Sequence, residues 1–145
     1  VLRIVDYKTG KVEKKDVKAG ESLAETLQDK ELKTKLFQLW MYKFLVKMEL
    51  QKAPEERIEA LKGLASERLT IEPGIISFRN FKDQLISSPL EFSEGEPETA
   101  FIQESNALIK HWVDELVSEE TVFEKTANLD QCTFCDFTSI CHRNV

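Results

Sequence analysis

The pattern of apolar and polar positions predicts a strand at the start of the chain, two strong helices and an irregular end. Residues 1–8 include four aliphatic residues among the first five, which is typical of a strand covered on both faces, and Thr9-Gly10 ends the run. Apolar residues at helical spacing predict one long helix over about 29–52 and a second over about 98–119. Past Phe123 the pattern is irregular.

Several shorter elements are expected between these three. Ser22, with Glu25 three residues later, has the spacing of a helix start in which side chains cap the first turn. The alternating, β-branched stretch over 69–81 predicts further strand, with a turn at Pro73-Gly74. The other expected elements are a strand or an exposed turn over 11–17, a helix over 55–67 that begins after Pro54, and a short helix over 81–86.

Together these elements predict an α/β fold, a small mixed sheet flanked by helices, in a single domain over 1–145. The chain is long enough to bury a core, with 41% hydrophobic and 32% charged residues. No apolar run approaches the roughly 20 residues of a membrane helix, and no secretory signal stands at the front. We therefore expect a cytoplasmic protein with no membrane partner. Its expected parts are a strand and helix over 1–52, a helical and strand core over 53–122, and a cysteine-containing tail over 123–145.

The net charge of −6 is unevenly distributed along the chain. Residues 1–52 hold twelve Lys and Arg against eight Asp and Glu, whereas residues 53–145 hold eight against eighteen. The positive excess therefore lies beside the first strand, as a surface that binds phosphates requires. A solvated, lysine-rich helix explains the same excess without any ligand.

Asp6 and Lys8 stand two residues apart at the end of the first strand, so their side chains project from the same face. A carboxylate there can hold Mg²⁺, with the backbone carbonyl of Tyr7 as a second oxygen ligand. The ammonium can orient an attacking water or stabilise charge that develops on a phosphate. A strand-end salt bridge is the alternative interpretation, because the same acid–x–Lys spacing recurs at Glu13, Asp16 and Glu31.

The long helix carries a second candidate pair. Gln38 and Tyr42 are four residues apart, so they share a face of this helix. The apolar stripe does not require a glutamine at this position. The alternative is an amphipathic helix in which Gln38 faces water and Tyr42 buries its ring while its hydroxyl stays solvated.

The three cysteines of the chain, Cys132, Cys135 and Cys141, fall within ten residues of one another near its end. Without a secretory context, this spacing indicates metal ligation more than a disulfide scaffold. Thiolates favour an iron–sulfur cluster or zinc, and zinc would use His142 as a strained fourth ligand. The alternative is three reduced cysteines, two of them packed beside Phe134 and Phe137.

Three motifs in order carry a family resemblance: "IVDYKTG", a helix with Gln-x-x-x-Tyr about thirty residues later, and a terminal "CTFCDFTSICHR". Together they resemble the RecB-type branch of the PD-(D/E)XK nuclease superfamily, which includes the nuclease domains of RecB- and AddB-type helicase–nucleases. By this resemblance Asp6 matches the metal-binding acid and Lys8 the catalytic lysine. Gln38 and Tyr42 match the helix motif that borders the active site and helps to position DNA.

The resemblance implies a restriction-endonuclease-like α/β fold, Mg²⁺ or Mn²⁺ as cofactor, DNA as partner, and a helicase domain or subunit beside it. It also favours a [4Fe–4S] cluster on Cys132, Cys135 and Cys141, with a fourth cysteine far upstream. The family has a further acid on a preceding hairpin strand, and often a glutamate on an earlier helix. Because this chain begins on the motif strand, we expect it to be the C-terminal portion of a longer nuclease domain.

The sequence therefore predicts a metal-dependent DNA nuclease that acts in repair or recombination, in which Asp6, Lys8, Gln38 and Tyr42 form the site. One carboxylate and one carbonyl are too few ligands to bind Mg²⁺ tightly, so we expect this chain alone to cut DNA poorly or not at all. The alternative function is a nuclease-like scaffold that no longer cuts and instead binds DNA or a partner subunit.

Overall fold

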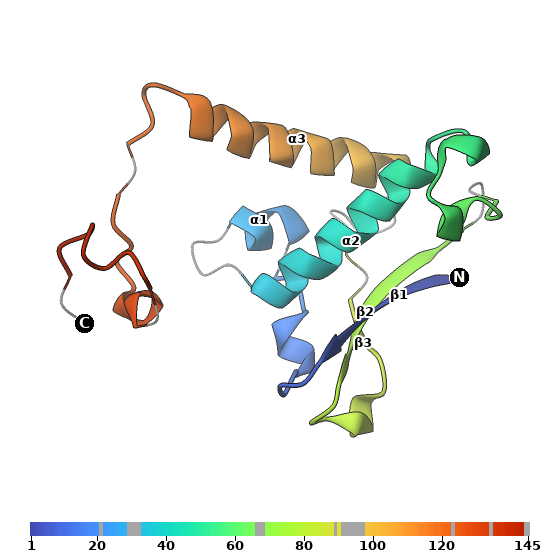
Figure 1. Ribbon diagram of the computed structural model, residues 1–145, viewed down its shortest axis with the longest axis horizontal. Helices are drawn as coiled ribbons and strands as arrows, with labels where there is room; N and C mark the ends of the chain where they lie inside the picture. The colour runs from blue at the N-terminus through green and yellow to red at the C-terminus, as the bar shows by residue number, and fades with distance from the viewer. Residues whose placement is uncertain are drawn as a thin grey trace. The chain divides into compact units, whose positions relative to one another are not determined.

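The chain forms two compact units, Val1–Lys110 and His111–Val145, each described here by itself. The first unit contains the sheet and its covering helices. The second contains the end of the last helix and the cysteines. The computed structural model describes residues 1–20, 22–28, 33–65, 69–88, 90, 98–122, 124–133 and 135–143 (Figure 1).

A three-stranded mixed sheet lies at the centre of the first unit. Its order is β1 (Leu2–Lys8), β2 (Ile71–Ser77) and β3 (Ile86–Ser87). β1 and β2 are parallel, with Leu2 opposite Ile71 and Lys8 opposite Ser77, whereas β3 is antiparallel to β2. Because parallel strands require a crossover, the helices between β1 and β2 are brought back against the sheet. This arrangement confirms the predicted α/β class.

The expected turn at Pro73-Gly74 is wrong, because both residues lie inside β2. Leu2 N donates to Thr70 O and Phe78 N donates to Lys8 O, at 2.8 and 2.9 Å. In this parallel ladder the backbone of Pro73 therefore points away from β1, toward β3. β3 pairs only with Gly74 and Ile75, so Pro73 lies just beyond its end and no ladder bond requires the missing N–H.

The predicted helices are present with small differences in extent. They are α1 (Leu23–Gln28), α2 (Thr34–Leu50) and α3 (Glu98–Val117). The Ser22 hydroxyl accepts a hydrogen bond of 3.0 Å from the backbone N–H of Glu25, as the capping pattern predicted. The first residues of the expected 29–52 helix, 29–32, lie outside the described part of the chain.

The helix expected over 55–67 is wrong. The structure has short 3₁₀ turns at Pro54–Glu56 and Glu59–Leu61, and residues 66–68 lie outside the described part. The reason is Arg57, which is buried and donates to the carbonyls of Leu50, Lys52 and Leu64. The bonds to Leu50 and Lys52 satisfy carbonyls left open at the end of α2, so the segment wraps around that helix end rather than extending as a helix.

The short segments 11–17 and 81–86 each contain a 3₁₀ turn. Over 11–17 the chain forms a 3₁₀ turn at Lys14–Asp16, so the turn alternative holds and the strand does not. The short helix expected over 81–86 is a 3₁₀ turn at Phe81–Asp83 followed by β3. Both segments lie against the carboxyl ends of β1 and β2, where the polar contacts described below hold them.

The core of the first unit lies between α2 and the sheet (Figure 1). Leu50, Leu61 and Ile71 form a buried cluster against which Leu2 and Ile4 pack. Trp40 is completely buried, and its indole Nε1 donates to Ser105 Oγ of α3 at 3.1 Å. None of the helices within the described residues combines the length and apolar character that crossing a membrane requires.

The apolar positions that predicted the late helix are buried only in its first half. Phe101 and Leu108 are buried, whereas Val113 and Leu116 are 50% and 63% exposed. The exposed half belongs to the second unit, which ends in a 3₁₀ turn at Leu129–Cys132 and otherwise irregular chain. The predicted irregular, cysteine-containing end is therefore present.

Candidate active site

Asp6 and Lys8 leave the same face of β1, as their two-residue spacing requires. Lys8 Nζ lies 3.0 Å from Asp6 Oδ2, and the two side chains are 31% and 18% exposed. Leu2 and Ile4 occupy the inner end of this face and pack on the core cluster. The apolar half of the strand thus anchors it, and the charged pair lies near its carboxyl end, where solvent still reaches it.

Gln38 joins this pair from α2. Lys8 Nζ donates a hydrogen bond of 2.9 Å to Gln38 Oε1, across 30 residues of sequence. A lysine ammonium held between a carboxylate and an amide oxygen has a fixed position, unlike the mobile end of an ordinary surface lysine. The structure therefore brings together three of the four side chains that the sequence singled out.

Tyr42 lies one turn further along α2 from Gln38, on the same helix face. It is half-buried, and among the described residues no hydrogen bond joins it to Asp6, Lys8 or Gln38. Tyr42 is therefore a neighbour of Gln38 on the helix and not part of this polar cluster.

One carboxylate oxygen of Asp6 is buried and lies against the Lys8 ammonium. Asp6 Oδ2 is buried and has no hydrogen-bond partner within the described chain, because its contact with Lys8 is an ion pair without hydrogen-bond geometry. A buried carboxylate oxygen without a hydrogen bond is costly unless something else compensates it. The Lys8 ammonium at 3.0 Å supplies part of that compensation, and a hard divalent cation, which prefers carboxylate oxygen, would add to it.

The Tyr7 carbonyl offers a second oxygen at the edge of the sheet. The ladder between β1 and β2 uses the backbone groups of the even-numbered β1 residues, so those of Tyr7 point away from β2. β1 is an outer strand of the described sheet, so this carbonyl faces an open edge. However, the described residues contain no group of three or more His, Cys, Asp or Glu side chains able to hold a metal. The site thus fits a cation through Asp6 but supplies few ligands.

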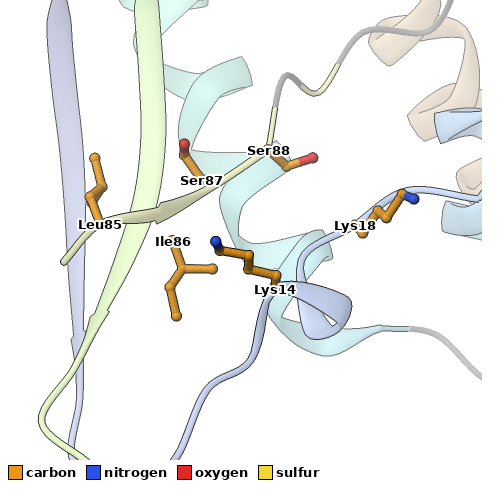
Figure 2. Close-up of a pocket in the computed structure, with 6 residues that line it drawn as sticks. All are labelled: Lys14, Lys18, Leu85, Ile86, Ser87 and Ser88. Atoms are coloured by element: carbon orange, nitrogen blue, oxygen red, sulfur yellow. The ribbon is translucent and has the colours of Figure 1, made fainter. Parts of the chain in front are cut away.

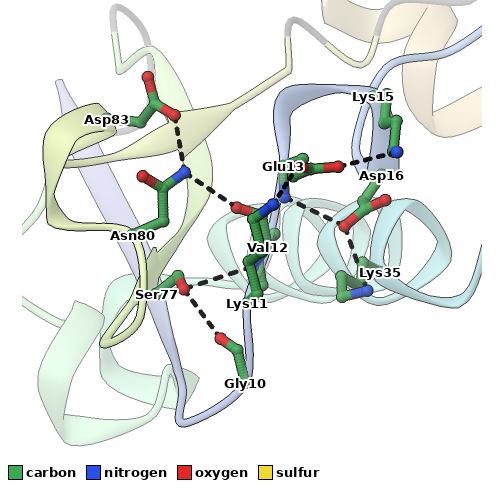
Figure 3. Close-up of polar contacts among 10 residues, drawn as sticks. All are labelled: Gly10, Lys11, Val12, Glu13, Lys15, Asp16, Lys35, Ser77, Asn80 and Asp83. Atoms are coloured by element: carbon green, nitrogen blue, oxygen red, sulfur yellow. Dashed lines mark hydrogen bonds and ion pairs between the residues drawn. The ribbon is translucent and has the colours of Figure 1, made fainter.

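Sequence reasoning missed Ser77, which holds the loop that follows Lys8 (Figure 3). Ser77 lies opposite Lys8 in the register and is almost fully buried. Its hydroxyl donates to Gly10 O at 2.8 Å and accepts from Val12 N at 3.3 Å. A serine at an inward position of a buried strand is the signal that could have identified it, because such a hydroxyl needs partners.

Asn80 also bonds to the segment that follows β1. Its Nδ2 donates to Val12 O at 3.3 Å and to Asp83 Oδ2 at 2.9 Å (Figure 3). Together, Ser77 and Asn80 tie the segment after β1 to the segment after β2. The backbone that carries Lys8 is therefore fixed at its exit from the sheet as well as along the strand.

The loop itself carries a network of ion pairs. Glu13 contacts both Lys11 and Lys15, at 2.5 and 2.8 Å, and Asp16 pairs with Lys35 of α2 at 3.4 Å. The hydrogen bond and charge of Lys11, followed by those of Lys15, lower the pKa of Glu13 to about 2. Glu13 is therefore ionised at neutral pH, and its charge is compensated by its own lysines.

The cysteines do not form a metal centre in this structure. Cys132 is buried and its Sγ accepts a hydrogen bond from Arg143 Nη1 at 3.4 Å, whereas Cys135 and Cys141 are half-buried. Within the described residues these thiols and His142 are not grouped as metal ligands. The residues present therefore fit neither an iron–sulfur cluster nor zinc. Phe134 lies outside the described part, and Phe137 is 64% exposed, so the expected packing beside Phe137 is weak.

Comparison with known proteins gives one match. The family model of the PD-(D/E)XK nuclease superfamily matches residues 1–142, which is nearly the whole chain. No curated protein and no solved structure matches the chain. The matched range begins with the strand that carries Asp6 and Lys8 and extends through the last cysteine.

Proposed function

The chain belongs to the PD-(D/E)XK nuclease superfamily, and from this premise we propose that it hydrolyses DNA phosphodiester bonds with a divalent cation. The observation that carries the proposal is the position of the Lys8 ammonium, which lies between Asp6 Oδ2 and Gln38 Oε1 at 3.0 and 2.9 Å. A lysine ammonium fixed next to a carboxylate is suited to a reaction in which negative charge develops on a phosphate.

Each residue has a separate role in this proposal. Lys8 stabilises the developing charge or orients the attacking water, and Gln38 holds its ammonium toward the substrate. Asp6 holds the cation through its carboxylate, together with the Tyr7 carbonyl. Tyr42, one turn beyond Gln38, contacts the DNA that lies along α2.

Mg²⁺ or Mn²⁺ bound at Asp6 would polarise the phosphate and lower the pKa of a bound water. Because the described residues supply only one carboxylate there, we propose that the chain alone binds the cation weakly and cuts slowly. We further propose that it acts in DNA repair or recombination beside a helicase, as the portion of a RecB-like nuclease domain that carries these motifs. An iron–sulfur cluster on Cys132, Cys135 and Cys141 would require rearrangement of the second unit.

The experiment compares the wild-type chain with Asp6→Asn and Lys8→Met on end-labelled DNA, over a wide range of Mg²⁺ and Mn²⁺ concentrations. Asp16→Asn is the matched control, because it removes a carboxylate paired with Lys35 outside the site. The proposal expects slow, cation-dependent cleavage by wild type and Asp16→Asn, and none by the two site variants. Cleavage that survives Asp6→Asn overturns it.

The second candidate is a scaffold that binds DNA or a partner subunit without cutting. The observation that favours it is the single carboxylate at the site within the described residues. It predicts that wild type and Asp6→Asn bind DNA equally and that neither cuts at any cation concentration. That outcome would replace the nuclease proposal.

A further inference from the structure

A pocket of about 300 Å³ lies beside β3, outside the Asp6–Lys8 site. Lys14 and Lys18 line it from the segment after β1, and residues 85–88 line it from the opposite side (Figure 2). Ile86 forms an apolar wall and is almost completely buried, and Ser88 contributes a buried polar residue. The Lys14 ammonium points toward Ile86 and Ser87, whereas Lys18 lines the pocket with its side-chain stem and directs its nitrogen away from Ile86 (Figure 2). Among the described residues the lining contains two lysines, serines and an apolar wall, with no carboxylate.

The charge around this pocket is positive although the whole chain is acidic. Glu13 and Asp16 are each engaged by other lysines, and Asp83 is shared between Asn80 and Lys14, whose Nζ lies 3.3 Å from Asp83 Oδ1. Among the described residues, no carboxylate pairs with Lys18. Lys33 Nζ donates to Lys18 O at 2.9 Å and so brings a third ammonium close by. Such a surface attracts a polyanion.

The sheet register relates this pocket to the candidate active site. Asp6 lies opposite Ile75 of β2, and Ile75 lies opposite Ile86 of β3, so the three residues are in line across the sheet. Residues directly opposite one another share a face, and neighbouring strands lie roughly 4.8 Å apart. Ile86 is therefore roughly 10 Å from Asp6 across the sheet. Ile75 between them is fully buried, so DNA would reach both places over the surface and not along this line, and the separation is a few nucleotides of a DNA strand.

We infer that the Lys14–Lys18 pocket binds a backbone phosphate of the DNA on which the candidate active site acts. This inference rests on the proposed function for the identity of its ligand, but it concerns DNA binding and not cleavage. Two lysine ammoniums with a neighbouring serine recognise phosphate without reading base sequence. The pocket would hold the DNA a few nucleotides from the bond that is cut.

The test measures DNA affinity of the 145-residue chain in EDTA, where cleavage does not interfere. The probes are a fluorescein-labelled single strand of about 12 nucleotides and its duplex. Fluorescence anisotropy measures the binding of each probe at several salt concentrations. The double variant Lys14→Gln/Lys18→Gln is compared with Lys52→Gln/Lys62→Gln. The control pair has the same charge change, and its lysines are 50% and 45% exposed and paired with glutamates.

We expect the pocket variant to bind DNA roughly tenfold more weakly at low salt. The slope of log K against log salt concentration should also become shallower by about one. The control pair should bind like wild type. Lys14→Arg/Lys18→Arg keeps the charge and should keep the affinity, and an unchanged urea midpoint of Lys14→Gln/Lys18→Gln excludes a folding defect. A neutral methylphosphonate linkage at one position of the probe should weaken DNA binding by wild type but not by Lys14→Gln/Lys18→Gln.

Equal affinities for the pocket and control variants would overturn the inference, and so would an absence of DNA binding by wild type. A further result would also overturn it: wild type binds inorganic phosphate in the pocket, but saturating phosphate does not change its affinity for DNA. The pocket would then serve a small anion and not DNA. These results are independent of the cleavage assay. A chain that binds DNA through Lys14 and Lys18 but never cuts would support this inference and reject the nuclease proposal.

Discussion

The ammonium nitrogen of Lys8 lies 2.9 Å from Oε1 of Gln38, although the two residues are 30 positions apart in the chain. This hydrogen bond joins the end of β1 to α2 and sets the direction in which the lysine points. It is therefore the contact on which the geometry of the candidate site depends.

Replacing Gln38 with Ala should lower cation-dependent cleavage by roughly 10- to 100-fold, because the Lys8 ammonium would lose the acceptor that positions it. The cost in the free energy of unfolding should be only about 1 kcal/mol, since one partly buried hydrogen bond is lost. Gln103→Ala is the control, because Gln103 is an exposed glutamine on α3. Equal cleavage rates for the two variants would show that Gln38 does not position Lys8.

Ser77→Ala should destabilise the first unit by about 1–3 kcal/mol, because it removes the hydroxyl that bonds Gly10 O and Val12 N. Urea unfolding measures this change. Ser87→Ala is the matched control, because its exposed hydroxyl makes one weak contact of 3.4 Å with Glu72. If Ser77→Ala unfolds at the same urea concentration as Ser87→Ala, the loop after Lys8 is held by other contacts.

Gly74→Ala should also be destabilising, by about 1–3 kcal/mol, because of overpacking between β2 and β3. A Cβ at this position would lie 2.7 Å from Leu85 Cδ1 and 3.2 Å from the backbone oxygen of Ile86. Gly63→Ala is the control, since nothing lies within 4 Å of a Cβ there. Thermal unfolding should separate the two variants. Similar melting temperatures would mean that β3 moves aside at little cost.

Glu13 should make a small contribution to stability that depends on pH. Lys11 and Lys15 lower its pKa from 4.5 to about 2, so the folded state favours the ionised carboxylate. The contribution is complete above pH 4.5 and is lost as the pH falls toward 2. Because the pair is exposed, the effect should be modest and should weaken with salt.

The measurement for Glu13 is the urea midpoint of wild type and Glu13→Gln between pH 2 and pH 7, a range that runs from the lowered pKa of about 2 to well above the ordinary value of 4.5. The two midpoints should differ most above pH 4.5 and converge at the acidic end. Glu59→Gln is the control, because Glu59 is 89% exposed and has one lysine partner. A difference between wild type and Glu13→Gln that does not change with pH would contradict the prediction.

The periodicity of apolar residues along the chain was sufficient to predict the main strand and helices. The run of aliphatic residues predicted β1, and its two-residue period placed Asp6 and Lys8 on one face. Helical spacing predicted α2 and α3, and Ser22 with Glu25 predicted the start of α1. These features follow from backbone geometry over a few residues, so neighbouring positions are enough to determine them.

The failed predictions share a physical cause. Pro73-Gly74 has the composition of a turn, but β3 ends before it reaches Pro73, so the strand tolerates the proline. Residues 55–67 have the composition of a helix, but the Arg57 guanidinium is used to close the end of α2. At Pro73 a strand distant in sequence determined which backbone groups needed partners, and at Arg57 the neighbouring end of α2 did so.

The sequence by itself determined which side chains share a strand face or a helix face, because side-chain direction repeats with the backbone. Only the tertiary structure decided that Gln38 reaches Lys8, that Ser77 holds the loop that follows Lys8, and that the described thiols are not grouped as metal ligands. Those outcomes depend on which distant segments bury one another and satisfy their polar groups, and no local period records that choice.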